Sequence, residues 1–306
     1  MESITRQSLV RALAVPAKTY VYSFGCNPKE GLGADFVGLL KTLMVCLNHG
    51  IGFRLCTITK PRGFATKQGW ADYFEPIFEE AAGPFLEDLN LPRLPYQRRA
   101  PFVKPMVRSL LKATTRPAVD YFEFDDVGNC DQLIAPVFST SPNYLDARAK
   151  LFKILWQLNP ETRAAVDEMK AGATDLADYA SAVIRRGDKH TEASYVALSR
   201  YVAAIDRHVA PGRSVFLASD DARTISEMAR LMPHRRFFSV SDPNATGYVH
   251  AQFKKLPPAA RRRTILRHLA ELELLWGARQ HIGSKTVNAS WMVNAWRGGD
   301  GMLWLD

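Results

Sequence analysis

The residues best suited to chemistry lie in a charged loop between a predicted strand and a predicted helix. The apolar run 179–184 is typical of a short buried strand. The polar residues that follow it are Arg185, Arg186, Asp188, Lys189 and Glu192. A guanidinium group can bind two phosphate oxygens at once, and a carboxylate held near an ammonium group can act as a general base. The loop therefore predicts an anion site with a base beside it, and a solvated basic turn is the alternative reading.

The elements around this loop predict its place in the fold. Apolar periodicity predicts a helix over 195–209, a strand over 214–219 and a helix over 225–232. Alternating strands and helices are typical of a doubly wound parallel sheet, in which ligands bind beyond the carboxyl ends of the strands. Asp220 and Asp221 follow the strand 214–219, so we expect them at that edge, where carboxylates can hold ribose or base hydroxyls. Capping of the next helix is the alternative reading of Asp221.

The first part of the chain has a similar pattern with a glycine loop. A strand is predicted over 19–24, a helix over 35–49 and a second strand over 53–59. Gly31 and Gly33 lie in the loop before that helix, where backbone N–H groups and the helix N-terminus favour a phosphate. Tight-turn geometry explains the glycines equally well.

A helical stretch separates the two halves of the chain. Helices are predicted over 144–157 and 160–171, with Asn159 as N-cap and Pro160 at the first helical position. Gly172 closes this stretch. We therefore expect two domains, residues 1–172 and residues 173–306.

Composition narrows the function classes. The 306 residues carry a formal net charge of +9, but the basic residues form short scattered groups without a zinc-finger or RNA-recognition motif. An anionic substrate or a peripheral membrane contact therefore explains the charge better than nucleic acid does. None of the four cysteines forms a CxxC pair, which argues against a disulfide scaffold or structural zinc. The sequence contains neither a run of transmembrane length nor a secretory signal pattern, so we expect a cytoplasmic protein.

The charged loop resembles the donor site of a known enzyme family. Its pattern Arg-Arg-x-Asp-Lys-x-Thr-Glu-Ala, residues 185–193, is similar to that of the α-1,6-fucosyltransferases of animals and rhizobia. Their usual form is His-Val-Arg-Arg-Thr-Asp-Lys, then Gly-Thr-Glu-Ala. The run Val-Phe-Leu-Ala-Ser-Asp-Asp, residues 215–221, resembles their second motif, Val-Phe-Leu-Ala-Thr-Asp-Asp. Gly-Trp and Phe-x-Pro within 69–76 also match, and Tyr201 lies nine residues after Glu192, as in the family.

The chain departs from the family pattern at several places. The loop is one residue shorter, and Val183 stands where the family has His. Glu271 falls at the position of an Asp in the third motif, and Thr286-Val287-Asn288 replace Ser-Ser-Gln. No His follows Gly33 in the first helix at the place where the family has one.

The resemblance implies an α/β, GT-B-like enzyme with two Rossmann-like domains facing across a cleft. Such an enzyme moves L-fucose from GDP-β-L-fucose to a glycan hydroxyl, such as O6 of N-acetylglucosamine, with inversion and without a bound metal or other cofactor. The resemblance also implies three catalytic residues. Glu192 deprotonates the acceptor hydroxyl, Lys189 keeps the Glu192 carboxylate ionised, and Arg185 stabilises the departing diphosphate. The implied donor-binding residues are Gly31, Gly33, Arg185, Arg186, Asp188, Tyr201, Asp220, Asp221, Glu271, Thr286, Val287 and Asn288.

The implied partners are a GDP-sugar donor and an oligosaccharide or glycoconjugate acceptor. The departures at Val183, Glu271 and 286–288 leave two alternatives open. One is the same fold with another nucleotide sugar as donor, and the other is a catalytically silent, glycan-binding relative.

Overall fold

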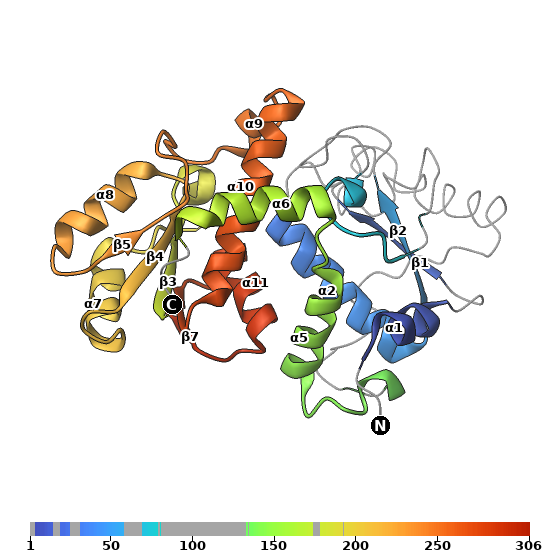
Figure 1. Ribbon diagram of the computed structural model, residues 1–306. Helices are drawn as coiled ribbons and strands as arrows, with labels where there is room; N and C mark the ends of the chain where they lie inside the picture. Colours follow the sequence, from blue (N-terminus) through green and yellow to red (C-terminus); the bar gives the residue numbers. More distant parts are fainter. Residues whose placement is uncertain are drawn as a thin grey trace. The chain divides into compact units, whose positions relative to one another are not determined.

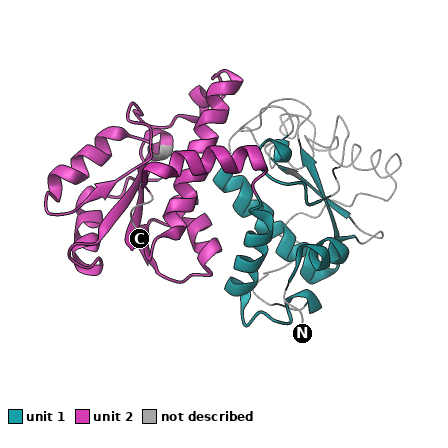
Figure 2. Cartoon of the chain, viewed as in Figure 1, with its two compact units in different colours: residues 1–157 teal, residues 158–306 magenta. Residues whose placement is uncertain are grey.

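The chain divides into two compact units, residues 1–157 and 158–306 (Figure 2). The structure, a computed structural model, describes residues 4–14, 19–24, 31–57, 69–78, 80, 133, 135–173, 178–191 and 193–306. The sequence places the domain boundary after Gly172, whereas the compact units divide before α6 (Pro160–Lys170). The physical reason is that α6 packs on α10 (Pro258–Gly277) of the second unit, where Arg163 Nη1 lies 2.8 Å from Glu273 Oε2.

In the described chain, the second unit is built on a five-stranded parallel sheet. Its strand order is β5 (Phe237–Phe238), β4 (Ser214–Ser219), β3 (Tyr179–Ile184), β6 (Gln280–Gly283) and β7 (Met302–Trp304). The chain starts at the centre with β3, moves outward through β4 and β5, and returns to the other side of β3 with β6 and β7. This is the doubly wound topology that the sequence predicts.

Helices cover both faces of this sheet (Figure 1). On one face lie α7 (Leu198–His208) and α8 (Ala222–Leu231), and on the other lie α10 and α11 (Asn288–Arg297), with α6 beside α10. Side chains of alternate residues of β3 point to opposite faces of the sheet. Ala180 and Ile184 pack into the apolar core with Tyr201 of α7, whereas Ser181 Oγ, on the opposite face, donates to the Leu275 carbonyl of α10 at 2.8 Å.

The first unit contains the predicted strand–loop–helix–strand sequence. β1 (Thr19–Phe24) and β2 (Gly52–Thr57) pair in parallel, and α2 (Leu32–His49) connects them. α2 ends where the sequence predicts, because Gly50 adopts the left-handed conformation at φ 60°. The unit also contains α1 (Arg6–Leu13), the 3₁₀ turns η1 (Gly69–Asp72) and η3 (Pro136–Phe138), and α5 (Tyr144–Leu155).

The Gly-Trp…Phe-x-Pro segment forms part of the core of the first unit. Trp70 and Phe74 are fully buried and stack with their ring centroids 4.4 Å apart. Phe36 of α2 joins them and packs against Phe152 of α5 at 4.7 Å. In this chain the segment therefore holds two helices together through aromatic packing.

Three predicted helix starts are wrong by three residues. α2 begins at Leu32 rather than at 35, and α8 begins at Ala222 rather than at 225. α7 begins at Leu198 rather than at 195, because Ala197 is extended and the Val196 carbonyl accepts a bond from Arg186. α10 begins at Pro258, with the proline at its first position. The helix α1 and the strand β7 were not predicted. In the part of the chain that the structure describes, no helix combines the length and apolar character needed to cross a membrane.

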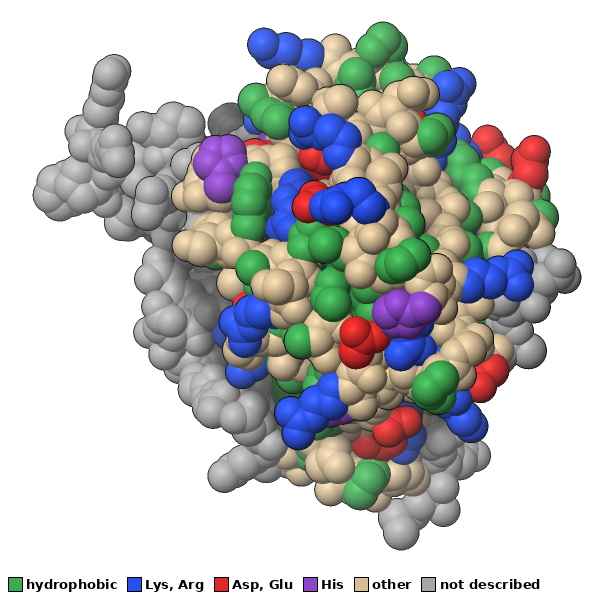
Figure 3. Space-filling model, turned by 90° about the vertical axis from the view of Figure 1, so that its left-hand side faces the viewer, with side chains coloured by type: hydrophobic (Ala, Val, Ile, Leu, Met, Phe, Trp, Pro, Cys, Tyr) green, Lys and Arg blue, Asp and Glu red, His purple; other side chains and the backbone are tan. Residues whose placement is uncertain are grey.

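The basic residues are scattered on the side of the molecule that Figure 3 shows. Lys and Arg side chains lie there as separate groups, mixed with hydrophobic, acidic and other polar residues. On this face the basic residues are therefore dispersed in short groups, as the sequence indicates.

Candidate functional site

The candidate site lies where the strand order of the second unit reverses. β3 and β6 are neighbours at the centre of the sheet, and the chain leaves their carboxyl ends in different directions. Arg185 and Arg186 follow β3, and the turn 284–287 follows β6. Such a switch point is the usual ligand site of an open α/β sheet. The pocket found here is lined by Arg185, Arg186, Ser194, Tyr195, Val196, Tyr201, Ser284, Thr286 and Val287. Five predicted donor-site residues are thus brought together.

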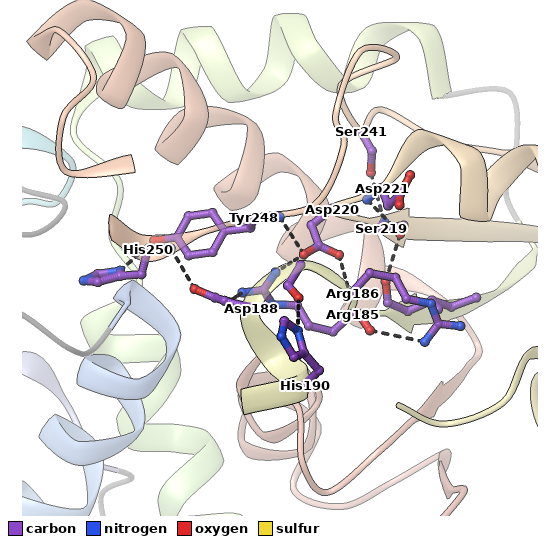
Figure 4. A network of polar contacts seen from close by, with 12 residues as sticks. Arg185, Arg186, Asp188, His190, Ser219, Asp220, Asp221, Ser241, Tyr248 and His250 are labelled. Atoms are coloured by element: carbon purple, nitrogen blue, oxygen red, sulfur yellow. Dashed lines mark hydrogen bonds and ion pairs between the residues drawn. The ribbon is translucent and has the colours of Figure 1, made fainter. Parts of the chain in front are cut away.

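The Arg185 guanidinium is held on two sides by carboxylates and on one face by an aromatic ring (Figure 4). Its Nη1 donates to Asp220 Oδ2, and its Nη2 donates to Asp188 Oδ1 at 3.1 Å. Its central carbon lies 4.8 Å from the centre of the Tyr248 ring. The side chain remains 24% exposed, so the group has a fixed orientation but is still accessible.

Asp220 connects three segments of the chain. Besides Arg185, it accepts the backbone N–H of Arg186 on Oδ1 at 2.7 Å and that of Tyr248 on Oδ2 at 2.9 Å. Asp188 has a similar role, since its Oδ2 accepts the backbone N–H of His250 at 2.7 Å. Both carboxylates therefore hold the loop in place.

Arg186 has a different environment from Arg185. Its Nη1 donates to the Val196 carbonyl at 3.2 Å, and its guanidinium lies 5.0 Å from the centre of the Tyr195 ring. The Tyr195 hydroxyl donates to the Gly187 carbonyl at 2.6 Å. Arg186 thus braces the end of the loop against the segment that leads into α7.

Tyr201 lies behind the two arginines. Its hydroxyl donates to the Val183 carbonyl at 3.0 Å, at the end of β3. Burial raises the pKa of Tyr201 to about 12, so its hydroxyl stays a neutral donor. Tyr201 therefore fixes the strand end from which the loop departs, and its ring lines the pocket.

The turn after β6 contributes hydroxyl groups and a helix N-terminus. The Ser284 and Thr286 hydroxyls are 2.7 Å apart, and the Lys285 N–H donates to Asp306 Oδ1 at 2.7 Å. α11 starts at Asn288 with Val287 as N-cap, and no side chain caps it. The positive end of a helix dipole and the first-turn N–H groups favour an anion here.

A buried histidine supports this turn from below. His281 Nδ1 lies 2.9 Å from Ser181 Oγ of β3, and its Nε2 lies 3.4 Å from Ser290 Oγ of α11. Burial lowers the pKa of His281 to about 3, so the imidazole is neutral at physiological pH. Two strands and a helix are thereby tied together beneath the pocket.

Asp221 and Glu271 already have partners within the fold. Asp221 caps α8 by accepting the Arg223 N–H at 3.0 Å, and it also pairs with the Arg223 guanidinium. Hydrogen bonding from Arg223 lowers the pKa of the Asp221 carboxyl. Glu271 Oε1 accepts the Ser241 hydroxyl at 2.6 Å. The capping reading of Asp221 is confirmed, and nucleoside binding by either residue stays a prediction.

The remaining predicted residues lie elsewhere or outside the described chain. Gly31 is the N-cap residue of α2 and Gly33 lies in its first turn, both in the first unit. A side-chain carbon added at Gly31 would meet no atom of the described residues within 4 Å, so their packing does not require glycine there. Glu192 lies outside the described residues. The backbone of Lys189 belongs to η5 (Gly187–Thr191), but its side chain is also outside them.

Sequence reasoning missed the segment 246–250, which packs on the loop. Gly247 was the available signal, because an isolated glycine after a turn often marks a close backbone approach. The buried support from His281 was also missed. Among the described residues, no group of three His, Cys, Asp or Glu side chains is arranged to hold a metal ion.

Comparison with known proteins gives similarity of structure only. No family model matches the sequence, and no curated protein matches it. The NodZ α-1,6-fucosyltransferase soaked with GDP-fucose matches with a TM-score of 0.51 at 14% identity, over 90% of this chain and 91% of that one. Fucosyltransferase NodZ from Bradyrhizobium matches with a TM-score of 0.50 at 14% identity, over 91% and 92%. A variant of Arabidopsis thaliana FUT1 in complex with GDP matches with a TM-score of 0.53 at 10% identity, over 97% and 73%.

These similarities concern the fold. The sheets are parallel, helices alternate with strands, and the architecture is shared with fucosyltransferases over most of the chain. The predicted fold class, an α/β protein of GT-B-like architecture, is confirmed.

Proposed function

We propose that this protein is a glycosyltransferase that moves L-fucose from GDP-fucose to a hydroxyl group of a glycan. The observation that carries the proposal is the set of anion-binding groups that meet at the switch point, namely Arg185, Arg186, the Thr286 hydroxyl and the N-terminal end of α11. This combination suits a diphosphate. The structural likeness to fucosyltransferases, one of them soaked with GDP-fucose, supports the same choice of donor.

In the proposed reaction, the acceptor oxygen attacks the anomeric carbon of fucose and the bond to the diphosphate breaks. Its electron pair leaves with GDP, and the configuration at the anomeric carbon inverts. Arg185 stabilises the growing negative charge on the diphosphate, because its guanidinium is oriented before the reaction begins. Glu192 accepts the proton of the acceptor hydroxyl, and Lys189 keeps that carboxylate ionised.

The other proposed contacts serve the nucleotide. Arg186 supports the loop, and Thr286, Val287 and Asn288 present their turn to the diphosphate. Asp221 and Glu271 hold ribose and guanine through acceptor positions that their present partners do not use. For Gly31 and Gly33, at the start of α2, the proposed role is a close approach of their backbone to a phosphate group.

The direct test is turnover of GDP-fucose with an array of N-acetylglucosamine-containing and other oligosaccharides. We expect fucosylated product, and we expect turnover to persist in excess chelator. Complete loss in chelator, restored by manganese or magnesium, would contradict metal independence.

Glu192→Gln tests the proposed base. General-base removal typically slows a reaction roughly 10²–10⁴-fold, so we expect transfer to be lost at that scale while GDP affinity is retained. Donor binding by calorimetry and transfer by product formation separate the two effects. A variant that turns over within a few-fold of wild type would exclude Glu192 as the base.

A thermal-shift panel distinguishes GDP-fucose from other donors. The unfolding temperature is measured with GDP-fucose, GDP-mannose, UDP-sugars and free nucleotides. Stabilisation by another nucleotide sugar alone would change the donor but keep the fold and the anion site. Glycan binding without turnover of any donor would favour the catalytically silent relative.

A further inference from the structure

Residues 246–250 pack on the loop that follows β3 and carries Arg185 and Arg186. This segment is hydrogen-bonded both to Asp188 of the loop and to Asp220 at the end of β4 (Figure 4). The Tyr248 N–H donates to Asp220 Oδ2 at 2.9 Å, the Asp188 N–H donates to the Tyr248 carbonyl at 2.9 Å, and the Gly247 N–H donates to the Asp220 carbonyl at 2.7 Å. The loop and the segment therefore form one hydrogen-bonded unit.

Two glycines make this close crossing possible. Gly187 has φ +56° and Gly247 has φ +106°, conformations that other residues rarely adopt. A side-chain carbon on Gly187 would overlap the Tyr248 backbone, and one on Gly247 would lie 2.8 Å from the Gly187 Cα. The usual form of the fucosyltransferase loop has Thr where this chain has Gly187. The crossing is thus built into this sequence rather than implied by the resemblance.

The crossing places the Tyr248 ring against Arg185. The Arg185 guanidinium carbon lies 4.8 Å from the ring centre. The ring is held in turn by its hydroxyl, 2.9 Å from His250 Nδ1, and by the Phe253 ring at 5.6 Å. Burial raises the pKa of Tyr248, so the ring remains neutral beside the guanidinium.

Arg185 therefore has three restraints of two kinds. Asp220 and Asp188 each bind one terminal nitrogen and fix the edge of the guanidinium. An aromatic face fixes the plane, because the ring quadrupole attracts a cation placed over it. A planar group with both its edge and its plane fixed loses little orientational freedom when it binds phosphate oxygens.

We propose that Tyr248 is a positioning residue for the transfer, acting through Arg185 by holding the plane of its guanidinium toward the diphosphate. This inference rests on the proposed function, in which Arg185 stabilises the departing diphosphate. The proposal assigns a role to a side chain that needs no contact with the substrate. It also predicts that the aromatic face, not the hydroxyl, is the part that matters.

The test compares Tyr248→Leu with Tyr248→Phe, using kcat, KM for GDP-fucose and GDP affinity. Loss of a partly desolvated cation–π contact corresponds to roughly a 5- to 30-fold effect, so we expect Tyr248→Leu to lower both kcat and GDP affinity by that factor. Tyr248→Phe keeps the ring and should stay within about threefold of wild type, because only the hydroxyl contact is lost. Thermal unfolding verifies that each variant is folded, and Tyr248→Met replaces the Leu variant if that one is not.

A double-mutant cycle decides whether Tyr248 acts through Arg185. In an Arg185→Ala background, Tyr248→Leu should cause no further loss of GDP affinity. An equal loss in both backgrounds, or wild-type behaviour of the folded Leu variant, would overturn the proposal. If wild-type protein neither bound GDP nor turned over GDP-fucose, the proposed function would fail instead. The cycle is then run with the nucleotide that the thermal-shift panel identifies.

Discussion

Asp220 and Asp221 are adjacent, follow the same strand, and have different structural roles. Asp220 accepts bonds from Arg185, from the backbone of Arg186 and from the backbone of Tyr248. These partners lie about 30 residues away on either side in the sequence. Asp221 accepts bonds from its near neighbour Arg223 and caps α8. One aspartate connects distant segments, and the other completes a local helix end.

The ion pairs Arg185–Asp220 and Arg223–Asp221 also differ in how far their arginine side chains are exposed to solvent. The Arg185 side chain is 24% exposed, whereas that of Arg223 is 79% exposed. Solvent screens an exposed pair strongly, so its contribution to stability is small. Removing one partner of a shielded pair leaves the other charge uncompensated, which costs much more. We therefore expect substitutions on the Asp220 side to affect both folding and function, and those on the Asp221 side to affect little.

The largest effect should come from Asp220→Asn. The amide would turn an NH₂ group toward N–H donors that Asp220 now accepts, while Arg185 keeps Asp188 as a carboxylate partner. Each donor left unsatisfied costs roughly 1–3 kcal/mol, and Oδ2 serves two donors, so we expect a loss of roughly 2–5 kcal/mol in the free energy of unfolding. GDP affinity should fall as well, because the loop loses the carboxylate that binds the Arg185 side chain and the Arg186 backbone N–H. Urea unfolding and calorimetry measure the two losses.

Asp221→Asn is the matched control for stability. Asparagine is also a good N-cap, so the free energy of unfolding should change by less than about 1 kcal/mol. Similar losses in the two variants would remove the distinction between the neighbouring aspartates.

The next effect concerns the two arginines. Lysine keeps the charge but lacks the planar fork, so Arg185→Lys should lose the bonds to both carboxylates in their present geometry. Loss of one stabilising donor at a developing charge costs roughly 3–4 kcal/mol, and we expect a reduction of that size in kcat/KM for GDP-fucose. Arg186→Lys should be milder, because its guanidinium bonds to backbone carbonyls and packs on Tyr195.

Kinetics and GDP affinity of both lysine variants, measured side by side, make this comparison. Equal and small effects would mean that neither arginine contacts the donor, and the diphosphate site would have to lie elsewhere.

A smaller effect concerns His281, which also connects distant segments but carries no charge. Its folded-state pKa of about 3 lies below the ordinary value of about 6.5. The unfolded chain therefore takes up the proton first as the pH falls. The stabilisation is fully present above the unfolded pKa and is lost as the pH falls toward 3. Between pH 6.5 and 5 the loss from this group is roughly 2 kcal/mol.

His281→Asn should have a flatter pH dependence, since an amide can still donate to Ser181 without titrating. Urea unfolding at pH 7, 6 and 5 compares the slopes, above the range in which carboxylates titrate. Parallel slopes for wild type and variant would show that His281 is not the titrating group.

The sequence predicts the sheet and the approach of the arginines to the aspartates, because both follow from local patterns. Apolar runs mark β3 and β4, and the carboxyl ends of neighbouring parallel strands meet at one edge. Asn159 and Gly50 also stand at the predicted helix ends. These features depend on residues close together in sequence.

The crossing of residues 246–250 over the loop could not be predicted in the same way. Gly187 and Gly247 are far apart in the sequence, and neither shows its partner through periodicity or spacing. The later start of α7 has a similar cause, since Val196 and Tyr195 bind Arg186 instead of continuing the helix. Tertiary contacts of this kind override local propensity.

The smallest expected effect is that of Arg223→Ala. Removing this guanidinium takes away one exposed ion pair with Asp221, and solvent screens such a pair strongly. The Arg223 backbone N–H, which Asp221 caps at 3.0 Å, is retained in the variant. We therefore expect no measurable change in the free energy of unfolding or in turnover.

The GDP affinity of the same variant tests whether Asp221 binds the nucleotide. If Asp221 binds the ribose, release of its carboxylate from Arg223 should tighten GDP binding slightly, whereas a purely capping Asp221 leaves it unchanged. A large loss of stability or of GDP affinity would mean that the Asp221 side is also part of the framework of the site.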